Sequence, residues 1–273
     1  MMRKGLLITL TVLLPLLANA QRSEVGIQGG VSFYMGDLNP TGVFNFVQPA
    51  GGIFYRYNFT EHWAIRGNAI LGWVYAEDAE SDVRSQIDRN LSFSSQVLEF
   101  SVYGELNFFR YTPGDMRHPI APFIFGGIAL FKFNPKADLD GTNYELQPLG
   151  TEGQGTTFYP DRKQYSLTTA SIPFGIGVKA NISKRLSVGI EWGMRYTFTD
   201  YLDDVSGVYA DPDIVMQESG EVAGQLSDRS LSGTTNEGRQ RGNSKTNDWY
   251  SFALLTFSYN IPGRPVKCAA YGE

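Results

Sequence analysis

The sequence predicts an all-β fold, an eight-stranded antiparallel transmembrane β-barrel with long extracellular loops. Three observations support this prediction: an N-terminal export signal, segments in which apolar and polar residues alternate, and connections that are short and long in turn. Alternation with period two places successive side chains on opposite faces of a strand. Several of these segments exceed the five or six residues usual in soluble strands, whereas tilted membrane strands need about 9–11 residues.

The first 20 residues have the three parts of a secretory signal peptide. Arg3 and Lys4 precede an apolar run at residues 6–17, and Ala18-Asn19-Ala20 fits a small-x-small cleavage site. The run is too short to cross about 30 Å of hydrocarbon as a helix. The predicted divisions are a removed signal peptide at 1–20, an outer-membrane barrel at 21–261 and a periplasmic C-terminal tail at 262–273.

The first four predicted strands lie at residues 24–34, 50–58, 63–73 and 98–109. The third and fourth each have one apolar and one polar face, and their polar faces hold Arg66, Glu99 and Glu105. The first two alternate less regularly and carry Val25 and Ile53 among their apolar residues. All four therefore fit strands with one lipid-facing side.

The last four predicted strands lie at residues 121–133, 172–180, 186–197 and 253–261. The second and third of these have polar faces that hold Lys179, Glu191 and Arg195. The segment at 121–133 is apolar on both faces, although its phenylalanines, from Phe123 onward, fall in phase. Pro173 is placed near a strand start, where proline is tolerated. The total number of predicted strands, eight, is even, as in bacterial outer-membrane barrels.

The charged residues of the polar faces should lie inside the barrel. An eight-stranded lumen is about wide enough for side chains, so these charges predict an interior ion-pair network in place of a channel. The predicted interior charges are Arg66, Glu99, Glu105, Lys179, Glu191 and Arg195.

The predicted connections alternate in length. The short ones lie at 59–62, 110–119 and 181–185, and the long ones at 36–48, 76–90, 134–170 and 198–248. Short periplasmic turns and long extracellular loops are typical of outer-membrane barrels, whereas a soluble sandwich predicts no such alternation. The protein is therefore expected in the outer membrane, with both termini in the periplasm.

The predicted periplasmic segments are basic, while the long loop at 198–248 is acidic. One hypothesis is that the basic rim docks an acidic partner, and the alternative is an ordinary solvated rim. The odd cysteine in the tail could cross-link to a periplasmic partner or remain a free thiol. The candidate partner-binding residues are Arg110, Arg117, Lys184, Arg185 and Cys268.

Composition and motifs disfavour an enzymatic, nucleic-acid-binding or cofactor-binding function. The formal net charge of −5 argues against nucleic-acid binding, and only two histidines, His62 and His118, are present, both in predicted turns. No catalytic residue, cofactor, metal or small-molecule substrate is therefore expected. Asp200, Asp203 and Asp204 could attract calcium, but a solvated acidic loop is the favoured interpretation.

Seven motifs resemble the PorG family over most of the mature chain. They are the segments at 24–30, 35–40, 172–179, 186–193, 197–207, 226–230 and 247–250. The resemblance implies a non-enzymatic outer-membrane barrel of the type IX protein secretion system of Bacteroidota, which supports gliding motility in some species. It also implies association with the periplasmic ring of the PorK lipoprotein and PorN. The alternatives are an adhesin or envelope stabiliser acting through extracellular loops, and a narrow porin, which the strand count disfavours.

Overall fold

The computed structural model describes residues 23–40, 42–233 and 235–261. The predicted signal peptide, the predicted tail and Cys268 lie outside the described residues. The elements are β1 (Ser23–Met35), β2 (Gln48–Asn58), β3 (Trp63–Glu77), η3 (Asp78–Glu80), α2 (Arg84–Arg89), β4 (Ser92–Asn107), β5 (Ile120–Lys132), β6 (Pro135–Leu139), β7 (Thr142–Glu145), α3 (Leu146–Leu149), β8 (Thr168–Asn181), β9 (Leu186–Thr197), α4 (Pro212–Ser219), α5 (Glu221–Ser227) and β10 (Trp249–Asn260).

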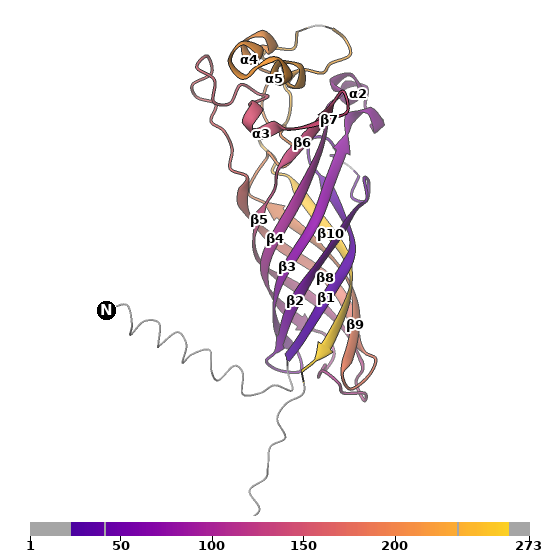
Figure 1. Ribbon diagram of the computed structural model, residues 1–273. Helices are drawn as coiled ribbons and strands as arrows, with labels where there is room; N and C mark the ends of the chain where they lie inside the picture. Colours follow the sequence, from indigo (N-terminus) through magenta and orange to yellow (C-terminus); the bar gives the residue numbers. More distant parts are fainter. Residues whose placement is uncertain (1–22, 41, 234, 262–273) are drawn as a thin grey trace, which may run out of the picture.

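Eight strands form a closed antiparallel barrel, which confirms the predicted fold (Figure 1). Around the barrel the order is β3-β2-β1-β10-β9-β8-β5-β4, and the pairing of β3 with β4 closes the circle. The first strand pairs with the last along nearly its whole length, from Glu24 with Asn260 to Met35 with Trp249. Among the described residues, no helix is long and apolar enough to span a membrane.

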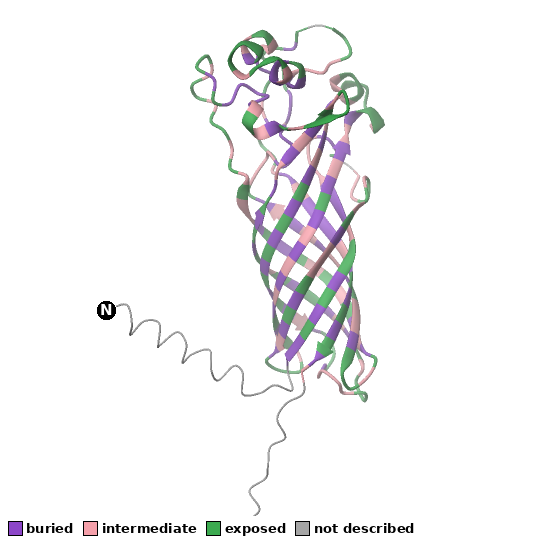
Figure 2. Ribbon diagram, viewed as in Figure 1, coloured by how far each residue is buried: buried purple, intermediate pink, exposed green. Residues whose placement is uncertain are grey.

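The outer surface of the barrel is apolar and the inner surface carries the charges. On β4, Phe100 is 58% exposed and Val102 48%, whereas Glu99 and Glu105 are fully buried. Figure 2 shows the same alternation of exposed and buried residues along the other barrel strands. An uninterrupted belt of exposed Ile, Leu, Val and Phe without strand edges is the surface of a barrel that spans a lipid bilayer.

In β5, the segment that is apolar on both faces, the large aliphatic residues and the aromatic residues lie on opposite sides of the strand. Its aliphatic residues Ile124, Ile128 and Leu130 point outward, and Ile128 is 72% exposed. Phe123 and Phe125 point inward and are buried. The phenylalanines of β5 therefore fill the lumen and do not face lipid.

Pro173 does not lie near a strand start, which corrects that expectation. It lies well inside β8, and the ladder between β5 and β8 has a gap where Gly127 and Ile128 face Pro173 and Ile172. Proline has no backbone N–H to donate, so the ladder loses a hydrogen bond at that point.

The connections follow the predicted alternation of short and long. Three short turns gather at one end, here called the turn end, together with the start of β1 and the end of β10 (Figure 1). The long connections gather at the other end and build a cap, consisting of the described residues of 36–47, 78–91, 133–167 and 198–248. The cap contains the hairpin β6–β7 and all five helices of the described residues, none of which the periodicity predicts.

The lumen has two different halves. Toward the cap it holds a hydrophobic core that includes Val74, Phe93, Phe131, Phe252 and Leu254. Toward the turn end it holds the charged network described below. The expectation of a polar interior is therefore wrong for the cap half. There the inward-facing residues of the strands are apolar and pack against apolar residues of the cap.

Candidate functional site

The charged half of the lumen is organised around Glu105 on β4. Its carboxylate lies 2.9 Å from Arg56 Nε, 3.1 Å from Arg66 Nε and 2.8 Å from Lys179 Nζ. These cations come from β2, β3 and β8, so one carboxylate joins four strands. All four side chains are buried, at 2% exposure or less.

Two further glutamates extend this network. Arg66 contacts Glu191 on β9 with two nitrogens, at 2.6 and 2.9 Å. Arg56 contacts Glu24 on β1 at 3.2 Å. Charge-assisted bidentate contacts of this kind are among the strongest hydrogen bonds in proteins.

A second group lies beside the first. Arg195 on β9 contacts Glu99 on β4 at 3.0 Å and donates to the Tyr103 hydroxyl at 2.7 Å. Tyr250 on β10 donates to the same glutamate at 2.9 Å. Tyr103 also lies 5.1 Å from the Arg66 guanidinium, which links the two groups.

All six predicted interior charges lie in these two groups, and two members were not predicted, Glu24 and Arg56. The polar face of β2 indicated where Arg56 points, but nothing in the sequence paired it with the first residues of β1. The carboxylates Glu24, Glu99, Glu105 and Glu191 balance the cations Arg56, Arg66, Lys179 and Arg195. The interior is therefore formally neutral.

Aromatic rings fill the space between these charges. Phe125 stacks on Tyr103 at 4.9 Å, and the Arg66 guanidinium lies 5.6 Å from the Phe125 ring. Glycines make room for the rings, since a Cβ on Gly177 would lie 2.5 Å from Phe123. Paired charges and rings therefore occupy this half of the lumen, as expected for an eight-stranded barrel whose interior is about wide enough for side chains.

The turn end carries the predicted partner-binding residues on its surface. Arg110, Arg117, Lys184 and Arg185 are all exposed. Only Arg110 among them has an ion pair within the described residues, with Glu61 at 3.4 Å. The turn between β4 and β5 and the turn between β8 and β9 therefore present these cations on one end of the barrel.

The two basic turns are tied to each other. The Asn181 side chain accepts a hydrogen bond from the Gly114 N–H at 3.0 Å and donates to the carbonyls of Thr112 and Asp115. Asn260 N–H donates to the Arg185 carbonyl at 2.8 Å, which fixes the second turn to β10. These hydrogen bonds therefore hold the two turns of the basic rim in a fixed position relative to each other and to β10.

The two histidines lie in the turns where they were predicted. His62 Nδ1 lies 3.0 Å from the Asn107 carbonyl, and His118 Nδ1 lies 3.4 Å from Asp115. The backbone N–H of His62 also donates to the Thr60 hydroxyl at 3.2 Å.

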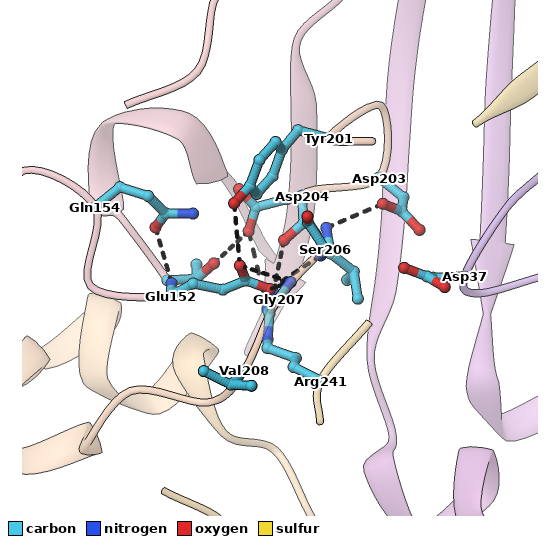
Figure 3. Close-up of polar contacts among 12 residues, drawn as sticks. Asp37, Glu152, Gln154, Tyr201, Asp203, Asp204, Ser206, Gly207, Val208 and Arg241 are labelled. Carbon is cyan, nitrogen blue, oxygen red and sulfur yellow. Dashed lines mark hydrogen bonds and ion pairs between the residues drawn. The ribbon is translucent and has the colours of Figure 1, made fainter. Parts of the chain in front are cut away.

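The cap is held by two arginines, the buried Arg241, which is drawn in Figure 3, and the half-buried Arg89. Arg241 contacts Glu152 at 3.2 Å and donates to the Asp204 carbonyl at 2.5 Å. Glu152 also accepts hydrogen bonds from the N–H groups of Ser206 and Gly207. These contacts join the cap segments 133–167 and 198–248.

Arg89 on α2 joins the remaining cap segments. It contacts Asp78 at 2.7 Å, donates to the Arg241 carbonyl at 2.6 Å and donates to the Asp37 carbonyl at 2.9 Å. Asp37 in turn accepts from the Asn243 N–H at 2.8 Å. All four long connections are thus bonded to one another.

The acidic residues of the segment 197–207 are not a solvated loop, which corrects that expectation. Asp203 and Asp204 are 1% and 0% exposed. Burial raises the pKa of Asp204 to about 6 and that of Asp200 to about 7. Within the described residues, no group of carboxylates, histidines or cysteines has an arrangement suited to a metal ion.

Comparison with known proteins gives a family. The family described as "Domain of unknown function (DUF6089)" matches residues 3–213, well over half of the chain. The chain belongs to the DUF6089 family. No curated protein matches the chain.

Among solved structures, this DUF6089 protein is similar to small outer-membrane proteins. Neisserial surface protein A is 9% identical, with a TM-score of 0.43 over 87% of this chain and 96% of that chain. Ail of Yersinia pestis is 8% identical, with a TM-score of 0.38 over 87% and 95%. OprG of Pseudomonas aeruginosa is 10% identical, with a TM-score of 0.37 over 89% and 97%.

The DUF6089 match ends within α4, before two features that complete the structure. The barrel closes only through β10, which pairs with β1 and β9. The cap is completed by Arg241 and Asp248, which also lie beyond residue 213. The barrel and its cap are therefore completed by residues beyond the matched region.

Proposed function

We propose that this protein is a non-enzymatic outer-membrane barrel subunit of the type IX protein secretion machinery. In this proposal the turn end faces the periplasm and contacts the ring of the PorK lipoprotein and PorN. The filled lumen is the observation that carries the proposal, because a barrel without an aqueous path acts through its surfaces. The motif resemblance supplies the identity of the machine.

The basic rim supports a periplasmic docking role. Lys184 and Arg185 are exposed, and the turn that carries them is fixed to β10 and to the neighbouring turn. Clustered surface cations steer and orient an acidic partner more than they add affinity. We therefore propose that the rim positions the barrel on an acidic face of the ring.

Two experiments test this proposal. Deletion of the gene should abolish or reduce the secreted protein profile and leave the cargo inside the envelope. The charge reversal K184E/R185E should reduce co-purification of PorK and PorN from solubilised membranes. A matched reversal at the opposite end, Lys163→Glu, should leave recovery unchanged. Normal secretion by the deletion strain would contradict the proposed role.

The ordered cap supports a second candidate, an adhesin or envelope stabiliser that acts through its long loops. Four cap segments joined through Arg89 and Arg241 form an ordered surface, and preorganisation lowers the cost of binding a partner. In that case the purified protein would be an isolated monomer, and secretion would be normal in its absence.

A further inference from the structure

Tyr34, at the cap end of β1, contacts two carboxyl groups from the segment 198–248. Its hydroxyl lies 2.5 Å from Asp203 Oδ2 and 3.2 Å from Asp248 Oδ1. The remaining carboxyl oxygens accept hydrogen bonds from the N–H groups of Val205 and Leu202, both at 2.9 Å. The three side chains are buried, so the barrel wall and the cap meet at a sealed acidic contact.

The geometry of this contact requires more protons than the phenol supplies. Tyr34 has one hydroxyl proton and can donate to only one of the two carboxylates. If both aspartates are ionised, the other carboxylate oxygen faces a phenol lone pair. One added proton completes a chain in which protonated Asp248 donates to Tyr34 and Tyr34 donates to ionised Asp203.

The surrounding charges do not remove this requirement. Within the described residues, no salt bridge includes Asp203 or Asp248, because Arg89 is paired with Asp78 and Arg241 with Glu152. Besides one another, the charged groups that act most on Asp203 and Asp248 are the carboxyl groups of Asp37 and Asp200 and the guanidinium of Arg89. The carboxyl groups outnumber this one arginine, and uncompensated buried charge is costly.

We propose that the cap is a proton-dependent latch, in which the group Asp203–Tyr34–Asp248 takes up a proton when the cap closes on the barrel and releases it when the cap loosens. This inference does not depend on the proposed secretion role. It means that the cap closes or loosens in response to the pH of the solution that it contacts.

The sign of the pH dependence follows from the direction of the pKa shifts. Burial raises the pKa of Asp203 and of Asp248, and the neighbouring carboxylates raise it further. A raised pKa in the closed state means that closure is fully stabilised below the ordinary aspartate pKa of about 3.9. The stabilisation is lost as the pH rises through the raised pKa values of Asp203 and Asp248.

Hydrogen exchange of the full protein in lipid nanodiscs tests the latch. After correction for intrinsic exchange rates, protection of the Leu202 and Val205 N–H groups should be greater at about pH 5 than at about pH 8. Each released proton can lower the protection factor by up to about tenfold per pH unit. Strand amides of β4 and β9 serve as the internal control for an intact barrel.

Two variants separate the latch from simple destabilisation. In Asp248→Asn the amide can donate to Tyr34 without an added proton, so the pH dependence of protection should fall to the part that Asp200 and Asp204 contribute. In Glu152→Gln the pair with Arg241 is weakened, so protection should fall at both pH values while its pH dependence remains. Equal protection of the original protein at both pH values, or an unchanged pH dependence in Asp248→Asn with intact strand protection, would overturn the proposal.

Discussion

Glu105 is the residue on which the interior network depends most, since three cations contact its carboxylate. We predict that Glu105→Gln lowers the free energy of unfolding by about 3–5 kcal/mol, because it leaves buried cations without their counter-charge. Reversible unfolding in urea with lipid vesicles measures this change. The matched control is Glu61→Gln, which removes an exposed pair with Arg110 and should cost about 0–1 kcal/mol. Equal costs for the two substitutions would contradict the assigned role of the network.

At this scale the sequence predicts faces better than contacts. Period two placed Arg66, Glu99 and Glu105 on inward faces, because the alternation itself defines the two sides of a strand. It could not pair Glu24 with Arg56, because that contact depends on the register of β1 against β2, in which the two residues are direct partners. It also could not orient Phe123, because a strand that is apolar on both faces has no polar side to mark the lumen.

A substitution at Gly177 in β8 tests how closely the lumen is packed. A Cβ on Gly177 would lie 2.5 Å from the Phe123 ring and 2.8 Å from the Ile190 carbonyl, whereas a Cβ on Gly67 in β3 would meet nothing within 4 Å. We predict that Gly177→Ala lowers the free energy of unfolding by about 1–3 kcal/mol through overpacking. Gly67→Ala, measured by the same urea titration, should have little effect. A harmless Gly177→Ala would show that the lumen has free space.

The barrel strands and the order of short and long connections follow from the sequence, but the cap elements do not. The helices α3 and α5 and the hairpin β6–β7 are short, so they show too few repeats for a period to be recognised. Their stability comes from tertiary contacts such as Arg241 with Glu152, which join distant segments. The acidic segment at 197–207 was expected to be solvated because its sequence does not reveal the arginines and tyrosines that cover it.

The molecule as a whole is a filled barrel under an ordered cap. We predict that it conducts no ions in planar bilayers, because paired charges and aromatic rings occupy the lumen. Glu105→Gln should also remain non-conducting, since its side chain volume is nearly unchanged. Steady single-channel conductance by the original protein would favour the narrow-porin alternative.

The central claim, that the apolar outer wall is immersed in lipid, is tested most directly by spin labels along β4. In a Cys268→Ser background reconstituted into vesicles, labels introduced by Leu98→Cys, Phe100→Cys and Val102→Cys should collide strongly with lipid-soluble oxygen and weakly with a water-soluble nickel chelate. A label introduced by Ser101→Cys, which points into the lumen, should collide weakly with both. Strong collision of the outward labels with the nickel chelate would contradict a membrane-spanning barrel.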